Sequence, residues 1–174
     1  MFYKFTQSHD ISNFTPGDEI VKWTKTVNGE EYGSFYYEIN NQNVLNKAFS
    51  FVPANLRDQF DASYMKINHS IPPHIDNEII TVINFYIYPS GCTTTFFEMP
   101  DDLNPSETLE NHTNGGLYNR DALTIHDQFQ AFYGDVFALD VSKIHEVTGP
   151  EPVNRIAICL QSASVSLEDL IAAI

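Results

Sequence analysis

From residue 62 onward, the chain alternates between short apolar segments and tight turns. The segments are rich in Val, Ile, Thr and aromatic residues, which fit the pleated, half-buried surface of a sheet. Strands are predicted at 62–67, 79–88, 92–98, 129–133, 136–141, 144–148 and 155–161. Turn-forming residues separate them at 89–91, 134–135, 142–143 and 149–152. This pattern predicts a mainly β fold, either a sandwich or a barrel.

The length of the chain limits how many domains it can form. Its 174 residues are enough for one hydrophobic core and short for two. Hydrophobic residues make up 43% and aromatic residues 13% of the chain, which favours a packed globular protein over a disordered one. We therefore expect a single domain over residues 1–174, with its β core at about 60–162.

The first 60 residues are expected to be mostly irregular. The aromatic run at 34–39 predicts one strand there. Residues 43–51 place apolar side chains at helical spacing, which predicts a short helix packed on a sheet. A second short helical turn is predicted within 53–60.

Two further segments interrupt or follow the strands. Residues 99–128 are polar, contain prolines and glycines and show little periodicity, so we expect an insertion that could act as a lid. Ser166 followed by Asp169 resembles a capping box, which predicts a C-terminal helix over 166–174.

The charge of the chain bears on its partners. The formal net charge is −14, the pI is near 4.5, and only nine lysines and arginines are present. Binding to nucleic acid needs clusters of these residues, so the composition argues against it. An acidic surface would favour a cationic partner, and the sequence does not define an oligomeric state.

Cysteine usage and the N-terminus indicate the compartment. Cys92 and Cys159 form neither a disulfide framework nor a zinc pattern, and we expect two free thiols. The first residues carry no apolar signal core, and no stretch reaches the length of a membrane span. The expectation is a soluble cytoplasmic protein without a membrane partner.

The triplet His74-Ile75-Asp76 is the leading candidate for a metal site. In a strand, residues two apart point to the same face, so this imidazole and carboxylate could grip one ion from one side. A second imidazole, from His145 on another strand, would complete a facial set. Such a set leaves about three positions of an octahedron open, which O₂ chemistry at non-haem Fe(II) requires.

Arg155 is the second notable residue, because it opens an apolar strand. A buried arginine needs an anion, and a carboxylate of a small acid would suit its forked guanidinium. The alternative is a structural salt bridge to an Asp or Glu of the same chain. If the two last strands form a hairpin across the 149–152 turn, His145 and Arg155 become near cross-strand neighbours.

In order and spacing, these residues resemble the Fe(II)- and 2-oxoglutarate-dependent dioxygenases, most closely their prolyl-hydroxylase-like branch. That branch combines a Tyr before the first ligand with a His-x-Asp motif, a second His and a downstream Arg. The resemblance covers roughly residues 60–162. It is carried by Tyr64, His74-Ile75-Asp76, Gly134-Asp135, His145-Glu146-Val147 and Arg155-Ile156-Ala157-Ile158.

The resemblance implies a double-stranded β-helix (jelly roll) with a few flanking helices. It further implies that Fe(II) is bound by His74, Asp76 and His145. Arg155 would then pair with the distal carboxylate of 2-oxoglutarate. Tyr64 could hydrogen-bond this co-substrate, although a core aromatic is an equal alternative for it.

The strand predicted at 79–88 contains two polar residues, Thr81 and Asn84. Their parity places them on opposite faces, so at most one of them should face the cavity unless the strand has a bulge. We expect this to be Asn84, as a further contact to the co-substrate, with satisfaction of buried backbone groups as the alternative. Ala157 stands where the family often has a small polar residue, so no hydroxyl contact is expected from that position.

The function implied by the resemblance is hydroxylation coupled to decarboxylation of 2-oxoglutarate to succinate. The cofactors would be Fe(II), 2-oxoglutarate and O₂, with ascorbate as an additional candidate. A protein or peptide side chain is the favoured substrate, ahead of a small molecule. Two alternatives remain open: a non-catalytic jelly-roll binding module, and a cupin-type metal enzyme that does not use 2-oxoglutarate.

Overall fold

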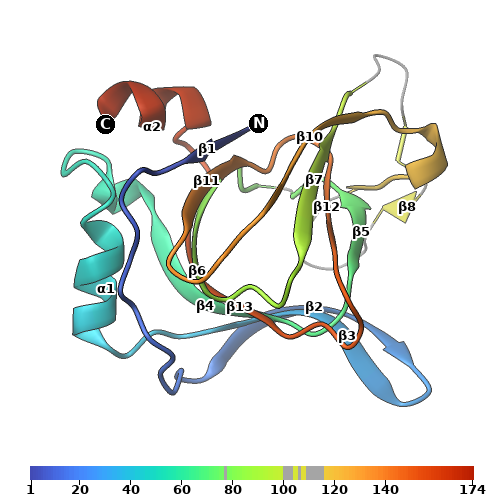
Figure 1. Cartoon of the computed structure of the whole chain (residues 1–174), viewed down its shortest axis with the longest axis horizontal. Coiled ribbons are helices and arrows are strands. Elements are labelled where there is room, and N and C mark those ends of the chain that lie inside the picture. The colour runs from blue at the N-terminus through green and yellow to red at the C-terminus, as the bar shows by residue number, and fades with distance from the viewer. Residues whose placement is uncertain (77, 100–103, 106, 109–115) are drawn as a thin grey trace.

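β-Strands dominate the fold, which is given by a computed structural model (Figure 1). The structure describes residues 1–76, 78–99, 104–105, 107–108 and 116–174. The strands form two antiparallel sheets, here called the major and the minor sheet. The major sheet has the order β1 (Phe2–Lys4), β11 (Val136–Asp140), β6 (Thr81–Tyr88), β13 (Arg155–Ser162), β4 (Asp61–Ile67), β3 (Glu30–Tyr37) and β2 (Glu19–Val27). The minor sheet has the order β10 (Ile125–Gln130), β7 (Thr93–Phe97), β12 (His145–Thr148), β5 (Ile71–His74), β9 (Gly116–Leu117) and β8 (Glu107–Thr108).

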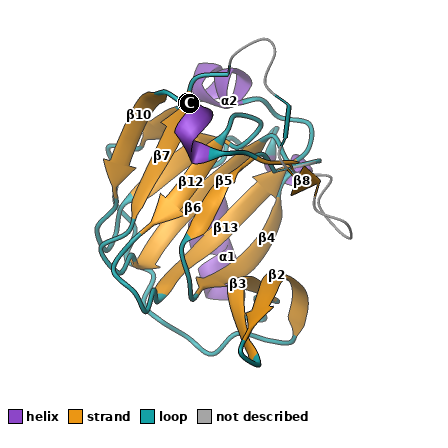
Figure 2. Ribbon diagram, turned by 90° about the vertical axis from the view of Figure 1, so that its right-hand side faces the viewer, coloured by secondary structure: helices purple, strands orange, loops and turns teal. Residues whose placement is uncertain are grey.

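The chain moves back and forth between the two sheets, as the ribbons in Figures 1 and 2 show. Strands β4, β6, β11 and β13 belong to the major sheet, whereas the intervening β5, β7, β10 and β12 belong to the minor sheet. This alternation is the winding of a double-stranded β-helix. The predicted mainly β, jelly-roll fold is therefore confirmed, and both sheets remain open at their edges.

Each face of the major sheet packs against a different partner. Side chains on its inner face meet the minor sheet in one hydrophobic cluster, which includes Met65, Tyr86, Phe96 and Val147. Side chains on its outer face, such as Phe85, form a second cluster with the helices. This division follows the strand period of two, because successive residues of β6 point to opposite faces.

The helices begin at capped positions. Helix α1 (Gln42–Phe49) starts after Asn41, whose side chain accepts hydrogen bonds from two backbone amides of the first turn. Helix α2 (Leu167–Ala173) starts after Ser166, whose hydroxyl accepts from the Asp169 amide. The helical turn predicted within 53–60 is a 3-10 helix, η1 (Arg57–Gln59).

The N-terminal third contains more β structure than predicted. The strand expected at 34–39 belongs to a hairpin of β2 and β3 that extends the major sheet. Asn28 and Gly29 form its turn, both with positive φ. An Asn-Gly pair favours this type of two-residue turn, so the sequence contained the signal for the hairpin.

The segment predicted as an insertion at 99–128 is partly regular where it is described. It includes β9, a 3-10 helix η2 (Arg120–Ala122) and most of β10, which the sequence predicted at 129–133 instead. The predicted lid falls largely on residues 100–103, 106 and 109–115, which lie outside the described part of the chain. Across the described residues, no helix has the length and apolar character needed to cross a membrane.

Candidate metal centre

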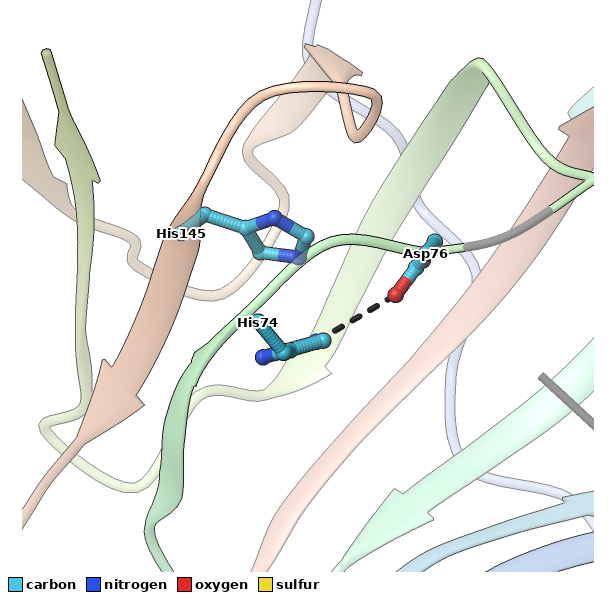
Figure 3. Close-up of side chains that lie close together, drawn as sticks. All are labelled: His74, Asp76 and His145. Carbon is cyan, nitrogen blue, oxygen red and sulfur yellow. Dashed lines mark ion pairs between the residues drawn. The ribbon is translucent and has the colours of Figure 1, made fainter. Parts of the chain in front are cut away.

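His74, Asp76 and His145 come together on the minor sheet, as Figure 3 shows. One potential ligand atom from each of them lies within 4.8 Å of the other two. His74 ends β5 and His145 begins β12, and the two residues are direct partners in the antiparallel register. Their imidazole rings are 4.3 Å apart between centroids.

Asp76 reaches the site by a route that the sequence did not predict. Strand β5 ends at His74, so the two residues are not aligned by strand parity. Instead, the chain leaves the strand and the Asp76 amide donates a hydrogen bond to the Val141 carbonyl, at 3.1 Å. The Asp76 carboxylate then lies 3.2 Å from His74 Nε2.

Backbone carbonyls fix the orientation of both imidazoles. His74 Nδ1 lies 2.8 Å from the Pro72 carbonyl oxygen, and His145 Nδ1 lies 2.9 Å from that of Lys143. A carbonyl oxygen only accepts hydrogen bonds, so each Nδ1 carries the proton. Nε2 is then the atom available to a metal, and such outer contacts commonly hold histidine ligands in place.

Charge and burial set the protonation of the three groups. Burial opposes the charged form of His74, but the hydrogen bond and charge of Asp76 outweigh it and raise the pKa of His74. Burial likewise opposes the charged form of Asp76, and the two histidines outweigh it and lower the pKa of Asp76. Burial and the neighbouring His74 lower the pKa of His145 to about 4, so this imidazole is neutral at pH 7.

This donor set fits a divalent transition metal. Two imidazole nitrogens and one carboxylate oxygen on one side are the facial arrangement typical of non-haem Fe(II) sites. Adjacent ligands of an octahedral ion at about 2.1 Å lie about 3 Å apart, close to the separation between His74 Nε2 and Asp76 Oδ1. A metal ion would replace the proton that these two groups share.

A pocket runs from the three ligands to Arg155, between the two sheets. Its polar lining includes His74, His145 and Thr94 from the minor sheet and Tyr36, Asn84 and Arg155 from the major sheet. Arg155 is only 2% exposed. Its guanidinium donates to Thr94 Oγ1 at 3.1 Å and to the Tyr86 hydroxyl at 2.7 Å.

Arg155 lacks the structural salt bridge that the sequence left open as an alternative. Within the described residues, no carboxylate lies within salt-bridge distance of its guanidinium. Its Nε also finds no hydrogen-bond partner there. A buried cation without a protein anion calls for an anionic ligand, and the pocket is where such a ligand can reach it.

The predicted hairpin between the strands of His145 and Arg155 is wrong. Strand β12 pairs with β5 and β7 in the minor sheet, whereas β13 pairs with β4 and β6 in the major sheet. The 149–152 segment crosses from one sheet to the other. His145 and Arg155 therefore face the same pocket from opposite walls.

The structure does not bring Tyr64 to the pocket. On β4, Met65 and Ile67 line the pocket, so Tyr64, which directly precedes Met65 in the strand, points to the outer face. There the Tyr64 ring packs edge-on against Phe14 and Tyr37, and its hydroxyl donates to Asn13. Tyr64 is thus a core aromatic, the alternative that the sequence left open.

Asn84 lies in the pocket, as expected from its parity in β6. Its Oδ1 accepts a hydrogen bond from the Cys159 thiol at 2.9 Å, and its Nδ2 lies 3.4 Å from the Tyr86 hydroxyl. Cys92 and Cys159 are both free and buried, as predicted. Asn84 therefore supports the groups around Arg155 in addition to lining the pocket.

The sequence-based prediction missed Tyr36 and Thr94, which line the pocket, and Tyr86, whose hydroxyl holds Arg155. Tyr86 has the same parity as Asn84 on β6, which would have placed it on the inner face. Thr94 is in a predicted strand, but nothing in the sequence pairs it with an arginine 61 residues away. Placing Tyr36 in the pocket would have required prediction of the β2–β3 hairpin and of its pairing with β4.

An ion pair on the far side of the minor sheet ties η2 to the strand of His145. Glu146 points away from the pocket, and its side chain is 2% exposed. Arg120 Nε lies 3.0 and 3.1 Å from its two carboxylate oxygens. Strand β9 meanwhile pairs with β5 at Leu117 and His74. The 116–122 segment is thereby attached to both ligand-bearing strands.

No protein-family model matches the sequence, and no curated protein matches it. Matching solved structures include vicilin from Corylus avellana (hazelnut), with 12% sequence identity and a TM-score of 0.40, over 76% of this chain and 28% of the vicilin chain. They also include E. coli ycfD, with 14% identity and a TM-score of 0.46, over 82% of this chain and 37% of that one.

A third match is AviO1 from Streptomyces viridochromogenes Tue57, with 14% identity and a TM-score of 0.46, over 83% of this chain and 74% of that one. The chain thus spans about a third of the length of the first two matched proteins.

Proposed function

We propose that this protein is an Fe(II)- and 2-oxoglutarate-dependent oxygenase that hydroxylates its substrate while 2-oxoglutarate is decarboxylated to succinate. The observation that carries the proposal is the state of Arg155. It is buried, has no carboxylate partner among the described residues, and shares a pocket with the His74, Asp76 and His145 set. A small acid that reaches both the metal and the arginine satisfies both ends of the pocket.

The metal end of the pocket supports Fe(II). Three protein ligands on one side leave about three coordination positions for other groups. Bound Fe(II) would supply O₂ activation and a chelating position for a 2-oxo acid. The protein supplies Nε2 of the two histidines, held by the Pro72 and Lys143 carbonyls, and the carboxylate of Asp76.

The other end supports a carboxylate. The Arg155 guanidinium is held in place by the Tyr86 and Thr94 hydroxyls, lines the pocket, and has an Nε without a partner among the described residues. Its planar fork matches a carboxylate bidentately. Ala157, two residues along β13 from Arg155 and on the same face of the strand, has a small side chain.

For the substrate, a protein or peptide side chain is the leading candidate and a small molecule the second. The resemblance of the motif to the prolyl-hydroxylase-like branch supports this order. The net charge of −14 supports a substrate other than nucleic acid.

An anaerobic titration tests the proposal. Fe(II) and 2-oxoglutarate are added to the protein without O₂, and the weak visible charge-transfer band of the chelate is recorded. The band should appear in the wild-type protein and be absent in His74→Ala and Asp76→Ala. With O₂ admitted, succinate should form in the wild-type protein alone.

The two alternatives give different results in the same assays. A cupin-type enzyme that does not use 2-oxoglutarate would bind Fe(II) without the band, and its turnover would survive Arg155→Ala. A non-catalytic binding module would produce no succinate at all. Either outcome would overturn the proposed function.

A further inference from the structure

We propose that Tyr36, from the β2–β3 hairpin, positions the 2-oxo acid by donating a hydrogen bond from its phenol to the bound acid. This inference rests on the proposed function and names a residue of that same site. It assigns to the N-terminal hairpin a direct part in binding the co-substrate.

The first support is the register of the major sheet. Tyr36 is the direct partner of Met65, Met65 of Ala157, and Ala157 of Tyr86, so the four form one row across β3, β4, β13 and β6. Direct partners in adjacent strands project to the same face of a sheet, here the face that lines the pocket. Tyr36 thus lies on the pocket face of the row, with Met65 between it and the small Ala157.

The second support is the location of the Tyr36 side chain in the pocket. Although Tyr36 as a residue is only half-buried, it lines the pocket that joins the metal ligands to Arg155. Burial raises the pKa of its phenol well above the ordinary value, and the charges of Asp76 and Arg155 both act on it. The phenol therefore lines the pocket and keeps its proton.

The third support is the hydrogen-bonding capacity of the site. Ser34, two residues earlier on the same face of β3, shares a side-chain hydrogen bond with Tyr36. A phenol combines one donor with acceptor capacity, so it can bond to Ser34 and to a ligand at once. Ala157 offers no hydroxyl, so under this proposal the phenol of Tyr36, on the same face of the sheet, makes the polar contact.

Tyr64 provides a matched control, since it is a buried tyrosine on the next strand that faces away from the pocket. Tyr36→Phe and Tyr64→Phe each remove one hydroxyl and keep the ring. The dissociation constant of 2-oxoglutarate is measured for both and for the wild-type protein by the anaerobic charge-transfer titration. The affinity for Fe(II) without 2-oxoglutarate and the thermal unfolding midpoint are measured alongside.

Tyr36→Phe should raise the dissociation constant of 2-oxoglutarate about tenfold, the usual size for a hydrogen bond to a charged group. Tyr64→Phe should change it less than about twofold, and Fe(II) affinity should stay at the wild-type value in both. If Tyr36→Phe unfolds, Tyr36→Gln, which keeps a side-chain donor, and Tyr36→Met, which has none, take its place. The glutamine variant should then bind the acid more tightly than the methionine variant.

A wild-type affinity in Tyr36→Phe, an equal loss in Tyr64→Phe, or equal affinities in the glutamine and methionine variants would overturn the role of Tyr36. In those cases the proposed function would still hold, provided that the wild-type protein shows the charge-transfer band. A wild-type protein without the band would overturn both.

Discussion

Tyr86 and Arg155, on neighbouring strands of the major sheet, make two contacts with each other. The Tyr86 hydroxyl accepts a hydrogen bond of 2.7 Å from the guanidinium, and the guanidinium carbon lies 4.8 Å from the centre of the Tyr86 ring. Thr94 holds the other terminal nitrogen from the minor sheet. The cation is therefore fixed by neutral groups and keeps its charge available for a ligand.

Removing this cation should weaken binding of the acid without affecting the metal. We expect Arg155→Ala to raise the dissociation constant of 2-oxoglutarate about a hundredfold, because truncation of one partner of a buried charged pair costs about 2–5 kcal/mol. Fe(II) affinity should be unchanged, since His74 and His145 lie on the other sheet. The charge-transfer titration measures the first quantity and a metal titration the second. A joint loss of both would mean that the substitution disrupts the fold.

The hydroxyl of Tyr86 should affect 2-oxoglutarate affinity indirectly, by holding the Arg155 guanidinium in place. Tyr86→Phe removes the 2.7 Å hydrogen bond and keeps the ring, so we expect about a fivefold to twentyfold loss of 2-oxoglutarate affinity. Tyr88→Phe, at a 52% exposed position of the same strand, serves as control and should bind like the wild-type protein. Equal 2-oxoglutarate affinities in the two variants would argue against a role for Tyr86 in holding the Arg155 guanidinium.

Metal binding should depend on pH in a defined direction. The pKa of His74 is raised by Asp76, and an incoming ion must displace that proton. Affinity for Co(II), used as an O₂-stable probe, should fall as pH decreases through the raised pKa and level off above it. His126→Gln, on exposed β10, should leave this profile unchanged. An affinity independent of pH would contradict the exchange of proton for metal.

The same shift makes a prediction for the metal-free protein. Because the folded-state pKa of His74 is raised, its protonated form stabilises the fold below the ordinary histidine value, and this contribution disappears as pH rises through the raised pKa. The stabilisation of the metal-free protein by added Co(II) should therefore be larger above that pKa than below it. Thermal unfolding with and without the ion at several pH values measures the difference.

The ion pair behind the metal strand should contribute to stability. Arg120→Ala leaves the buried Glu146 carboxylate without its partner, and we expect a loss of about 2 kcal/mol, less than for a fully buried pair because Arg120 is half-exposed. Adding Glu146→Gln removes the unpaired charge and should restore part of that loss. Urea unfolding of the two single variants and the double variant gives the coupling energy. A coupling near zero would show that the contact is not stabilising.

The sequence predicted strands well where side chains alternate between turns. Strands β11, β12 and β13 lie within one residue of their expected bounds, because apolar runs there end at Gly and Pro. Strand β10 was misplaced because most of its side chains are exposed. It belongs to the sheet through backbone pairing with β7, and the pattern of its side chains does not predict that pairing.

The candidate site was partly predictable for similar reasons. Residue types identified His74, Asp76, His145 and Arg155, but not how they meet. Residues 149–152, between the strands of His145 and Arg155, have the composition of a hairpin turn. Turn composition does not reveal which sheet the next strand joins, so the crossing to the major sheet was missed. The family resemblance left two roles open for Tyr64, and the sequence did not decide between them, because the direction in which β4 faces depends on its pairing with β13.

Under the proposed function, the placement of the metal ligands and Arg155 on opposite sides of the pocket would make the spacing of the sheets select the length of the co-substrate. Packed sheets lie about 10 Å apart, and neither wall can shift without disturbing the hydrophobic cluster that both share. The distance between the two packed sheets, rather than a single side chain, would then select the length of the acid. A 2-oxo acid one carbon shorter or longer than 2-oxoglutarate would satisfy one wall and miss the other.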